Sequence, residues 1–237
     1  MKKIGLVGGI SWTSTVDYYR YINEMTNEQL GGLHAAECIL YSVDFENFAR
    51  HNAAYNWDGT YSLLSYAVEN LEKAGAELIL LCANTAHIVA DRIAASSSLP
   101  LVDIRTAMLA AIKAAGLKSV ALMGTSYTME LHFYRDVLSA GGINVLVPEL
   151  EADRDFIEDT LQHELGVGML SPQTRQEYIR IANKMIQQGA QGIILGCTEL
   201  PLILSQNDFS LPVFDSTSIH AAAAVAFAFQ KENQHIQ

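Results

Sequence analysis

Three segments of the first half of the chain recur in the second half, in the same order and at nearly the same spacing. The offset is 115 residues from Gly9 to Gly124 and 112 residues from Asp103 to Asp215. The paired segments are 3–9 with 118–124, 75–84 with 189–198, and 99–103 with 211–215. Any parallel α/β protein repeats short apolar strands, but that alone does not explain the matched Gly and Pro residues at their ends. We therefore interpret the sequence as an internal duplication.

Apolar strands alternate with helices along the first half. We expect strands at 4–9, 38–43, 78–82 and 99–103, and helices at 14–30, 60–73 and 86–95. The first helix is expected to start at Ser14, which with Asp17 forms a capping pattern, and to end at Gly31. This alternation, together with the internal repeat, predicts an α/β fold of two pseudo-symmetric parallel-sheet lobes. We expect one lobe at residues 1–105 plus 216–237, because the Ala-rich helix after Asp215 can pack back on it, and the other at 106–215.

Composition limits the class of partner. The formal net charge is −11 without a cluster of Lys or Arg, so nucleic acid and anionic membrane surfaces are poor partners. Half of the residues are hydrophobic and 17% are charged, which is not the composition of a disordered chain. The apolar runs are too short for a transmembrane helix, and no signal-peptide cleavage pattern follows the first one. Three cysteines suit a reducing compartment better than a disulfide scaffold, so we expect a cytoplasmic protein.

Small polar residues follow four of the expected strands, at 8–11, 82–85, 124–126 and 196–199. Ligands of parallel sheets bind at the carboxyl ends of the strands, and the N–H groups of helix starts hold anions. We therefore expect a small molecule with a carboxylate as the ligand. The seven histidines lack metal-ligand spacing, and neither a dinucleotide fingerprint nor a P-loop is present, so no metal or cofactor is expected.

Cys197 is the strongest candidate for chemistry. It follows a glycine at a strand end, where nearby N–H groups are expected to lower the pKa of its thiol below about 8.5. The alternative, equally open from spacing alone, is a buried small hydrophobe. Cys38 is expected to serve packing, and Cys82 closes a strand that is expected to be buried. His87 is expected to cap or pack rather than to orient a catalytic group.

Three motifs together resemble the aspartate/glutamate racemase family. They are Gly8-Gly9-Ile10-Ser11-Trp12-Thr13-Ser14-Thr15, Ala83-Asn84-Thr85-Ala86-His87 and Leu195-Gly196-Cys197-Thr198-Glu199-Leu200, and the resemblance covers essentially the whole chain. It implies a fold of two pseudo-symmetric α/β lobes with the active site between them, often in a homodimer. Enzymes of this family racemise amino acids without pyridoxal phosphate, metal or nucleotide. It implies that Cys197 is one of two acid/base groups on opposite faces of the substrate Cα. It also implies that Asn84, Thr85 and Thr198 hold the α-carboxylate and amine, with Ser11 nearby. Glu199 is similar to the residue of the aspartate branch, where glutamate racemases tend to carry His.

The chain departs from the family pattern at the second thiol. That thiol lies immediately before Asn-Thr in the family, and here the position is Ala83. The internal repeat agrees, since an offset of 114 residues pairs Ala76 with Ala190 and Ala83 with Cys197. Neighbouring residues of a strand point to opposite sides, so Cys82 is expected to face away from the ligand. The second acid/base group is therefore missing, displaced or replaced. Thr85 is a candidate for it, because the resemblance to family members with a threonine at the thiol position implies that a hydroxyl or water can serve.

A second departure concerns the charge that would hold an acidic side chain. The family commonly uses a lysine of the second half, but no lysine lies between Lys118 and Lys184. Arg50 is the best remaining partner, or else a solvated loop charge. The sequence thus predicts a cofactor-independent racemase that acts at Cα of a small acidic amino acid, aspartate or glutamate, by thiol-based proton transfer. A single-thiol decarboxylase of the same superfamily and a catalytically impaired amino-acid or carboxylate binder are the alternatives.

Overall fold

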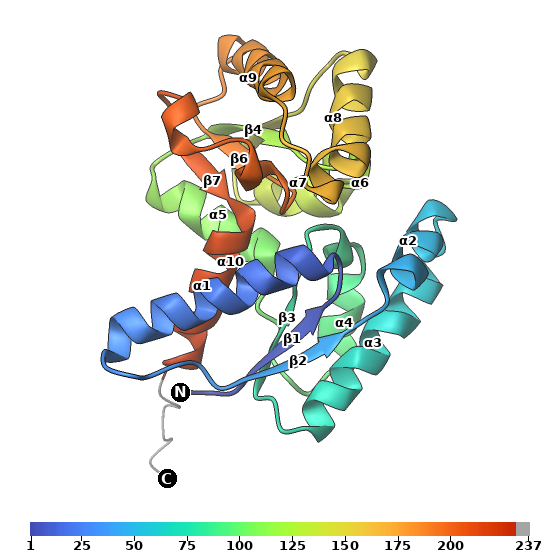
Figure 1. The fold of residues 1–237 in the computed structure, drawn as a ribbon, viewed down its shortest axis with the longest axis vertical. Coiled ribbons are helices and arrows are strands. Elements are labelled where there is room, and N and C mark those ends of the chain that lie inside the picture. The colour runs from blue at the N-terminus through green and yellow to red at the C-terminus, as the bar shows by residue number, and fades with distance from the viewer. Residues whose placement is uncertain (231–237) are drawn as a thin grey trace. The chain divides into compact units, whose positions relative to one another are not determined.

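The computed structural model describes residues 1–230 and divides the chain into two compact units. The first unit contains Met1–Cys82, Val89–Asp103 and the chain from His220 onward, and the second contains Ala83–Ile88 and Ile104–Ile219. Figure 1 shows a three-layered α/β arrangement in each unit, with helices on both faces of the sheet. No helix within residues 1–230 has both the length and the apolar character needed to cross a membrane.

The first unit is built on a parallel three-stranded sheet. Its strands are β1 (Ile4–Gly8), β2 (Cys38–Ser42) and β3 (Leu78–Leu81), in the order β2-β1-β3. A parallel bridge from Ile79 to Leu101 extends the sheet beyond β3. The helices of this unit are α1 (Trp12–Leu30), α2 (Phe45–Ala53), α3 (Trp57–Lys73), α4 (Ala90–Ser96) and most of α10 (Ser216–Ala228). The 3-10 helix η1 (Thr85–Val89) precedes α4 and belongs, except for Val89, to the second unit.

The second unit repeats this strand order in a four-stranded parallel sheet. Its strands are β4 (Ser119–Met123), β5 (Asn144–Leu146), β6 (Ile193–Leu195) and β7 (Val213–Asp215), in the order β5-β4-β6-β7. The helices are α5 (Ile104–Ala114), α6 (Ser126–Glu130), α7 (His132–Ala140), α8 (Glu151–His163) and α9 (Pro172–Gln187), with 3-10 helices η2 (Leu165–Val167), η3 (Leu200–Leu202) and η4 (Gln206–Asp208). The predicted class of two parallel-sheet α/β units is confirmed.

Backbone hydrogen bonds show the duplication residue by residue. Two hydrogen bonds between the β3 and β1 regions recur between the β6 and β4 regions. The bond from Glu77 N–H to Lys3 O corresponds to the bond from Gln191 N–H to Ser119 O. The bond from Cys82 N–H to Val7 O corresponds to the bond from Gly196 N–H to Met123 O. These pairs make Cys82 the counterpart of Gly196. Ala83 is therefore the counterpart of Cys197, as the offset in the sequence predicts.

Alternation along the strands gives each sheet two apolar faces. In the first unit, Leu78, Leu80 and Cys82 face a cluster made with α1 and α10, and α3 packs against β1 and β2. In the second unit, Ile193 and Leu195 face α8 and α9. The intervening residues of β4 and β6 face α5 and α7.

Helices α5 and α10 each pack in the unit opposite to the strands that precede them in sequence. Residues from Ala221 to Ala228 pack on β1 and β3 of the first unit. Helix α5 is placed in the reciprocal way, which the sequence does not predict: its buried residues Ile104, Met108 and Ile112 pack on β4 and β6 of the second unit.

Two local predictions are wrong. Helix α1 begins at Trp12 rather than Ser14, with Ser11 as N-cap, and the Ser14 hydroxyl donates to the Ser11 carbonyl at 2.9 Å instead of capping the helix. The segment 99–103 forms one bridge rather than a strand. Pro100 has no N–H to donate, so the pairing cannot extend to the N-terminal side of Leu101. The predicted end of α1 is confirmed, because Gly31 follows it with a φ of 72°.

Candidate active site

A glycine directly follows each of the strands β4 and β6, and the two glycines lie close together. A Cβ on Gly124 would lie 2.8 Å from the carbonyl oxygen of Gly196, and a Cβ on Gly196 would lie 2.9 Å from that of Met123. Cβ atoms do not approach backbone oxygens so closely, so both positions require glycine. The strand ends therefore bring the loops 124–126 and 196–199 side by side at the carboxyl edge of the sheet, where parallel sheets bind ligands.

Glu199 accepts two hydrogen bonds from the residues directly before it. The Cys197 Sγ–H donates to Glu199 Oε2 at 2.9 Å, and the Thr198 hydroxyl donates to the same oxygen at 2.8 Å. All three side chains are partly exposed. A thiol, a hydroxyl and a carboxylate thus form one hydrogen-bonded group that can exchange a proton internally and that a ligand can reach.

The thiol of Cys197 is held in its neutral form. Burial, together with the negative charge of Glu199 and the hydrogen bond to it, raises the pKa of Cys197 well above its ordinary value. The sequence-based expectation of a lowered pKa is therefore wrong. The expectation considered the backbone N–H groups near the strand end, whereas the adjacent carboxylate opposes ionisation of the thiol. Cys197 consequently rests as a proton donor.

The loop after β3 belongs to the second unit and is fixed there by side-chain hydrogen bonds. Asn84 is 4% exposed, and its Nδ2 donates to Ser216 Oγ at 3.0 Å. Ser216 Oγ in turn donates to the carbonyl of Leu195 at 2.8 Å. The hydroxyls of Thr85 and Thr125 lie 3.4 Å apart. The structure thus brings Asn84 and Thr85 to the ends of β4, β6 and β7.

Ala83 and His87 are joined by a hydrogen bond that holds this loop in place. Ala83 is buried, and its methyl group offers no proton-transfer chemistry. The Nδ1 of the fully buried His87 lies 2.9 Å from the Ala83 carbonyl, and its Nε2 accepts from the N–H of Ile104 at 3.2 Å. Because a carbonyl only accepts and an N–H only donates, the ring proton lies on Nδ1. His87 therefore joins the loop to the start of α5, as the packing interpretation predicts.

The two other cysteines have no place in this group. Cys82 is fully buried in the apolar cluster of the first unit, as predicted, and burial raises the pKa of its thiol far above the ordinary range. Cys38 lies in β2, half-buried against the same cluster, and burial raises its pKa to about 11. The three cysteines carry free thiols.

Ser11 and Arg50 lie in the first unit. Ser11 is the N-cap of α1 at the end of β1, and its hydroxyl lies 2.7 Å from that of Thr13. Arg50 is not in a loop, as the sequence suggested, but in α2. It is exposed and donates to the Asn47 Oδ1 at 2.8 Å. Its guanidinium thus remains accessible to an anion.

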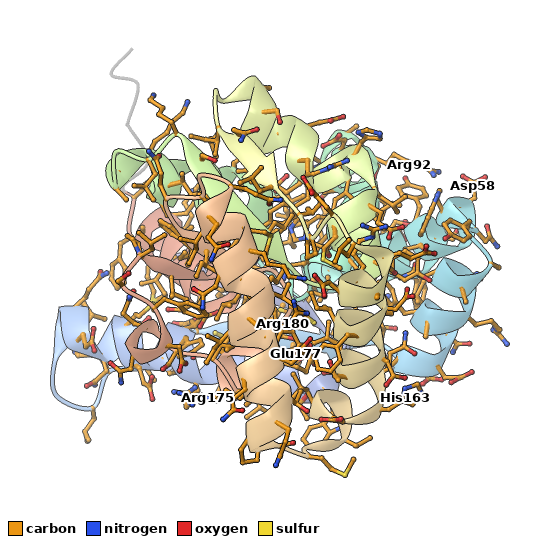
Figure 2. The ribbon with its side chains drawn as sticks, turned by 90° about the horizontal axis from the view of Figure 1, so that it is seen from above. Asp58, Arg92, His163, Arg175, Glu177 and Arg180 are labelled. Atoms are coloured by element: carbon orange, nitrogen blue, oxygen red, sulfur yellow. The ribbon has the colours of Figure 1, made fainter. Side chains whose placement is uncertain are left out.

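The cations of α9 are already paired within the second unit. Lys184 Nζ lies 2.9 Å from Asp153 Oδ2, and Arg180 also pairs with Asp153. Arg180 pairs as well with Glu177, and both are labelled on the same helix in Figure 2. Burial would raise the pKa of Asp153, but hydrogen bonds from Lys184 and Arg180 outweigh it and lower that pKa. These cations therefore stabilise the fold. Within residues 1–230, no group of three or more His, Cys, Asp and Glu side chains is placed to hold a metal ion.

Two residues of the second unit were missed in the sequence. Thr125 was noticed only as part of a strand-end loop, although its hydroxyl lies beside that of Thr85. Ser216 follows β7 directly, and this position at a strand end was the one available signal.

Comparisons with known proteins agree with this geometry. Residues 7–224 match the family model described as Asp/Glu/Hydantoin racemase. The solved structure of a candidate Asp/Glu racemase from Yersinia pestis is 47% identical, with a TM-score of 0.91 over 97% of this chain and 100% of that one. An aspartate racemase homologue from Pyrococcus horikoshii OT3 is 36% identical, with a TM-score of 0.86 over the same shares. The broad specificity amino-acid racemase RacX of Bacillus subtilis (strain 168) is 28% identical over 94% of this chain and 96% of its own length. The chain therefore belongs to the Asp/Glu/Hydantoin racemase family, a family of isomerases.

Proposed function

We propose that the chain is a cofactor-independent racemase that acts at Cα of a small acidic amino acid, aspartate or glutamate. The observation that carries this proposal is the Cys197 thiol, which donates to the Glu199 carboxylate at 2.9 Å beside the end of β6. Racemisation needs a group that can both give a proton to Cα and take one away. A thiol whose proton is shared with a carboxylate can do both.

The proton follows a short route in this mechanism. When the Cα carbanion forms, Cys197 donates its thiol proton to the face of the carbanion that lies towards Cys197. In the reverse direction, Glu199 takes the thiol proton, and the thiolate then removes the Cα proton. The positive charge of the substrate ammonium group favours this ionisation, because it offsets the charge of the new thiolate.

The substrate is held, in this proposal, by the neutral polar side chains around the thiol. Asn84, Thr85 and Thr198 bind the α-carboxylate and the amine, and Ser11 contributes a further hydroxyl. Arg50 binds the side-chain carboxylate, since its guanidinium is exposed and its charge is not neutralised by the neutral Asn47. The Arg50 contact makes the site prefer aspartate or glutamate to a neutral amino acid.

The opposite face of Cα is expected to have the weaker proton donor. Ala83, the counterpart of Cys197, provides a methyl group at that position. We propose that Thr85 acts there, through its hydroxyl and the neighbouring hydroxyl of Thr125, 3.4 Å away. A hydroxyl is a far weaker acid than a thiol. Protons should therefore return to the Cys197 face more often than to the other, and Cα exchange should be faster than racemisation.

The test is incubation in heavy water with each enantiomer of aspartate and glutamate. Deuterium at Cα is measured by NMR, and the enantiomer ratio by chiral chromatography. The wild type should exchange the Cα proton faster than it racemises, Cys197→Ser should lose both activities, and Cys38→Ser, a matched removal of a thiol, should keep both. Full activity of Cys197→Ser would refute the proposed role of the thiol.

The same experiment separates the alternatives. Release of CO₂ from a substituted malonate, without Cα exchange of an amino acid, would indicate a decarboxylase, and binding without exchange would indicate a binder. Ala83→Cys restores a second thiol and should raise racemisation relative to exchange, by 10² or more on the usual scale of acid–base catalysis. Ala83→Ser is its size-matched control and should give a much smaller gain.

We also propose that the protein acts as a homodimer in the cytoplasm. The family resemblance supports the dimer, and three free thiols suit a reducing compartment. Light scattering on the purified protein measures the molar mass in solution, and the mass of a single chain at micromolar concentration would refute the dimer.

A further inference from the structure

The hydroxyl proton of Ser216 is used in a hydrogen bond to the backbone. Its Oγ lies 2.8 Å from the carbonyl oxygen of Leu195, which can only accept a hydrogen bond. The hydroxyl must therefore donate to Leu195. Towards any other neighbour, Ser216 Oγ can then only accept. Ser216 is fully buried, so water does not compete for this hydrogen bond.

The hydrogen bond from Ser216 to Leu195 decides how the carboxamide of Asn84 is oriented. The atom of Asn84 that lies 3.0 Å from Ser216 Oγ must be a donor, which is Nδ2 and not Oδ1. A flipped amide would place two acceptors against each other. The sequence separation of 132 residues means that the start of α10 sets the orientation of a side chain in the loop after β3.

With Nδ2 facing Ser216, the other polar atom of the Asn84 carboxamide is the acceptor Oδ1. Asn84 Oδ1 is buried and has no hydrogen-bond partner among the described residues. A buried acceptor without a partner costs about 1–3 kcal/mol, so a ligand that donates to it regains this energy on binding. An ammonium group has only donors, whereas a carboxylate has only acceptors and would be repelled by Oδ1.

We propose that Ser216 is a positioning residue that locks the Asn84 amide with Oδ1 presented to the substrate ammonium group. The consequence for the substrate rests on the proposed racemase function, but the lock itself does not. The lock makes the site selective for α-amino acids over the matching α-hydroxy acids. A hydroxyl can donate or accept, so an α-hydroxy acid tolerates either orientation of the amide, while an ammonium group tolerates only one.

The first measurement requires no ligand. The side-chain NH₂ signal of Asn84 in the ¹⁵N-labelled full chain is identified by its loss in Asn84→Asp. Ser216→Ala should accelerate solvent exchange of these two protons at least tenfold, and Ser216→Thr, which keeps the hydroxyl, should leave it within a few-fold of the wild type. Unchanged exchange in Ser216→Ala would overturn the lock. Thermal unfolding of each variant verifies that the fold is retained.

The second measurement compares aspartate with malate, its α-hydroxy acid analogue, by titration calorimetry. In Ser216→Ala the affinity for aspartate should fall about tenfold or more, the scale of one hydrogen bond to a charged group, while the affinity for malate changes less than twofold. Ser216→Thr should restore the preference. Equal losses for both ligands would reduce Ser216 to a structural role and overturn the proposal. A wild type that binds neither ligand refutes the proposed substrate, and the proton exchange still decides the lock.

Discussion

Replacing Glu199 by Gln removes the negative charge that opposes ionisation of Cys197. Two unit charges separated by the 2.9 Å between Sγ and Oε2 repel by about 1.4 kcal/mol in water and by roughly 5.7 kcal/mol at an effective dielectric constant near 20. The lower figure suits a pair that is partly exposed. Glu199→Gln should therefore raise the thiolate fraction of Cys197 at least about tenfold at any pH below its pKa.

Alkylation by iodoacetamide measures this change. A thiolate of lower pKa is also less nucleophilic, with a Brønsted coefficient of about 0.45, so a tenfold gain in thiolate becomes a gain of roughly three- to fourfold in rate. The modified Cys197 peptide is quantified by mass spectrometry between pH 7 and 10. At each pH in this range, the Cys197 peptide should be modified faster in Glu199→Gln than in the wild type.

Two references make the measurement specific. Thr198→Val removes the other donor to the same carboxylate without changing its charge, so the Cys197 rate should change little. Cys38, with a pKa of about 11, reports on general changes in each sample. A Glu199→Gln variant whose Cys197 reacts at the wild-type rate, with the same pH profile, would refute the thiol–carboxylate pair.

Three further predictions concern stability and use denaturant unfolding. Asp153→Asn should lower the free energy of unfolding by about 1–2 kcal/mol at pH 7, less than for a fully buried pair, because Arg180 and Lys184 are 41% exposed. Since the pKa of Asp153 is lowered in the folded state, this difference should persist above the unfolded pKa of about 3.9 and vanish as the pH falls through the folded pKa. An undiminished difference at pH 2 would contradict the reasoning. Because burial raises the pKa of Cys82, the advantage of the wild type over Cys82→Ala should shrink by about 1.4 kcal/mol per pH unit above about 8.5, and a pH-independent difference would argue against a buried neutral thiol. His87→Ala leaves the Ala83 carbonyl and the Ile104 N–H without this partner and should cost about 2–4 kcal/mol, and a loss below 1 kcal/mol would show that the two hydrogen bonds are dispensable.

The parallel α/β class and the equivalence of the two halves could be predicted from the sequence, because Gly and Pro residues at nearly constant offsets bound the repeated apolar strands. The placement of α5 could not. Its apolar residues Ile104, Met108 and Ile112 fit either sheet by periodicity, and only tertiary packing on β4 and β6 decides between them.

The candidate site was predictable where one short segment carries the chemistry. Cys197, Thr198 and Glu199 are consecutive, so the motif located them, but not the direction of the Cys197 pKa. That direction depends on the Glu199 carboxylate folding back on the thiol. Contacts between distant segments leave no pattern in the sequence. The residues next to Ser216 in the sequence, for example, do not indicate its hydrogen bond to Asn84.

The matched hydrogen bonds of the two sheets show which side chains the two halves carry at equivalent positions. With Ala83 equivalent to Cys197, Thr85 is the counterpart of Glu199, so one scaffold position carries a thiol with a carboxylate in one half and a methyl group with a hydroxyl in the other. Only the first pair contains groups whose proton affinities suit transfer to and from carbon near neutral pH. If the enzyme racemises, the proton on the Ala83 side must come from a hydroxyl or water and should limit the rate. A solvent isotope effect on racemisation that exceeds the one on Cα exchange would be the signature of that asymmetry, and equal effects would contradict it.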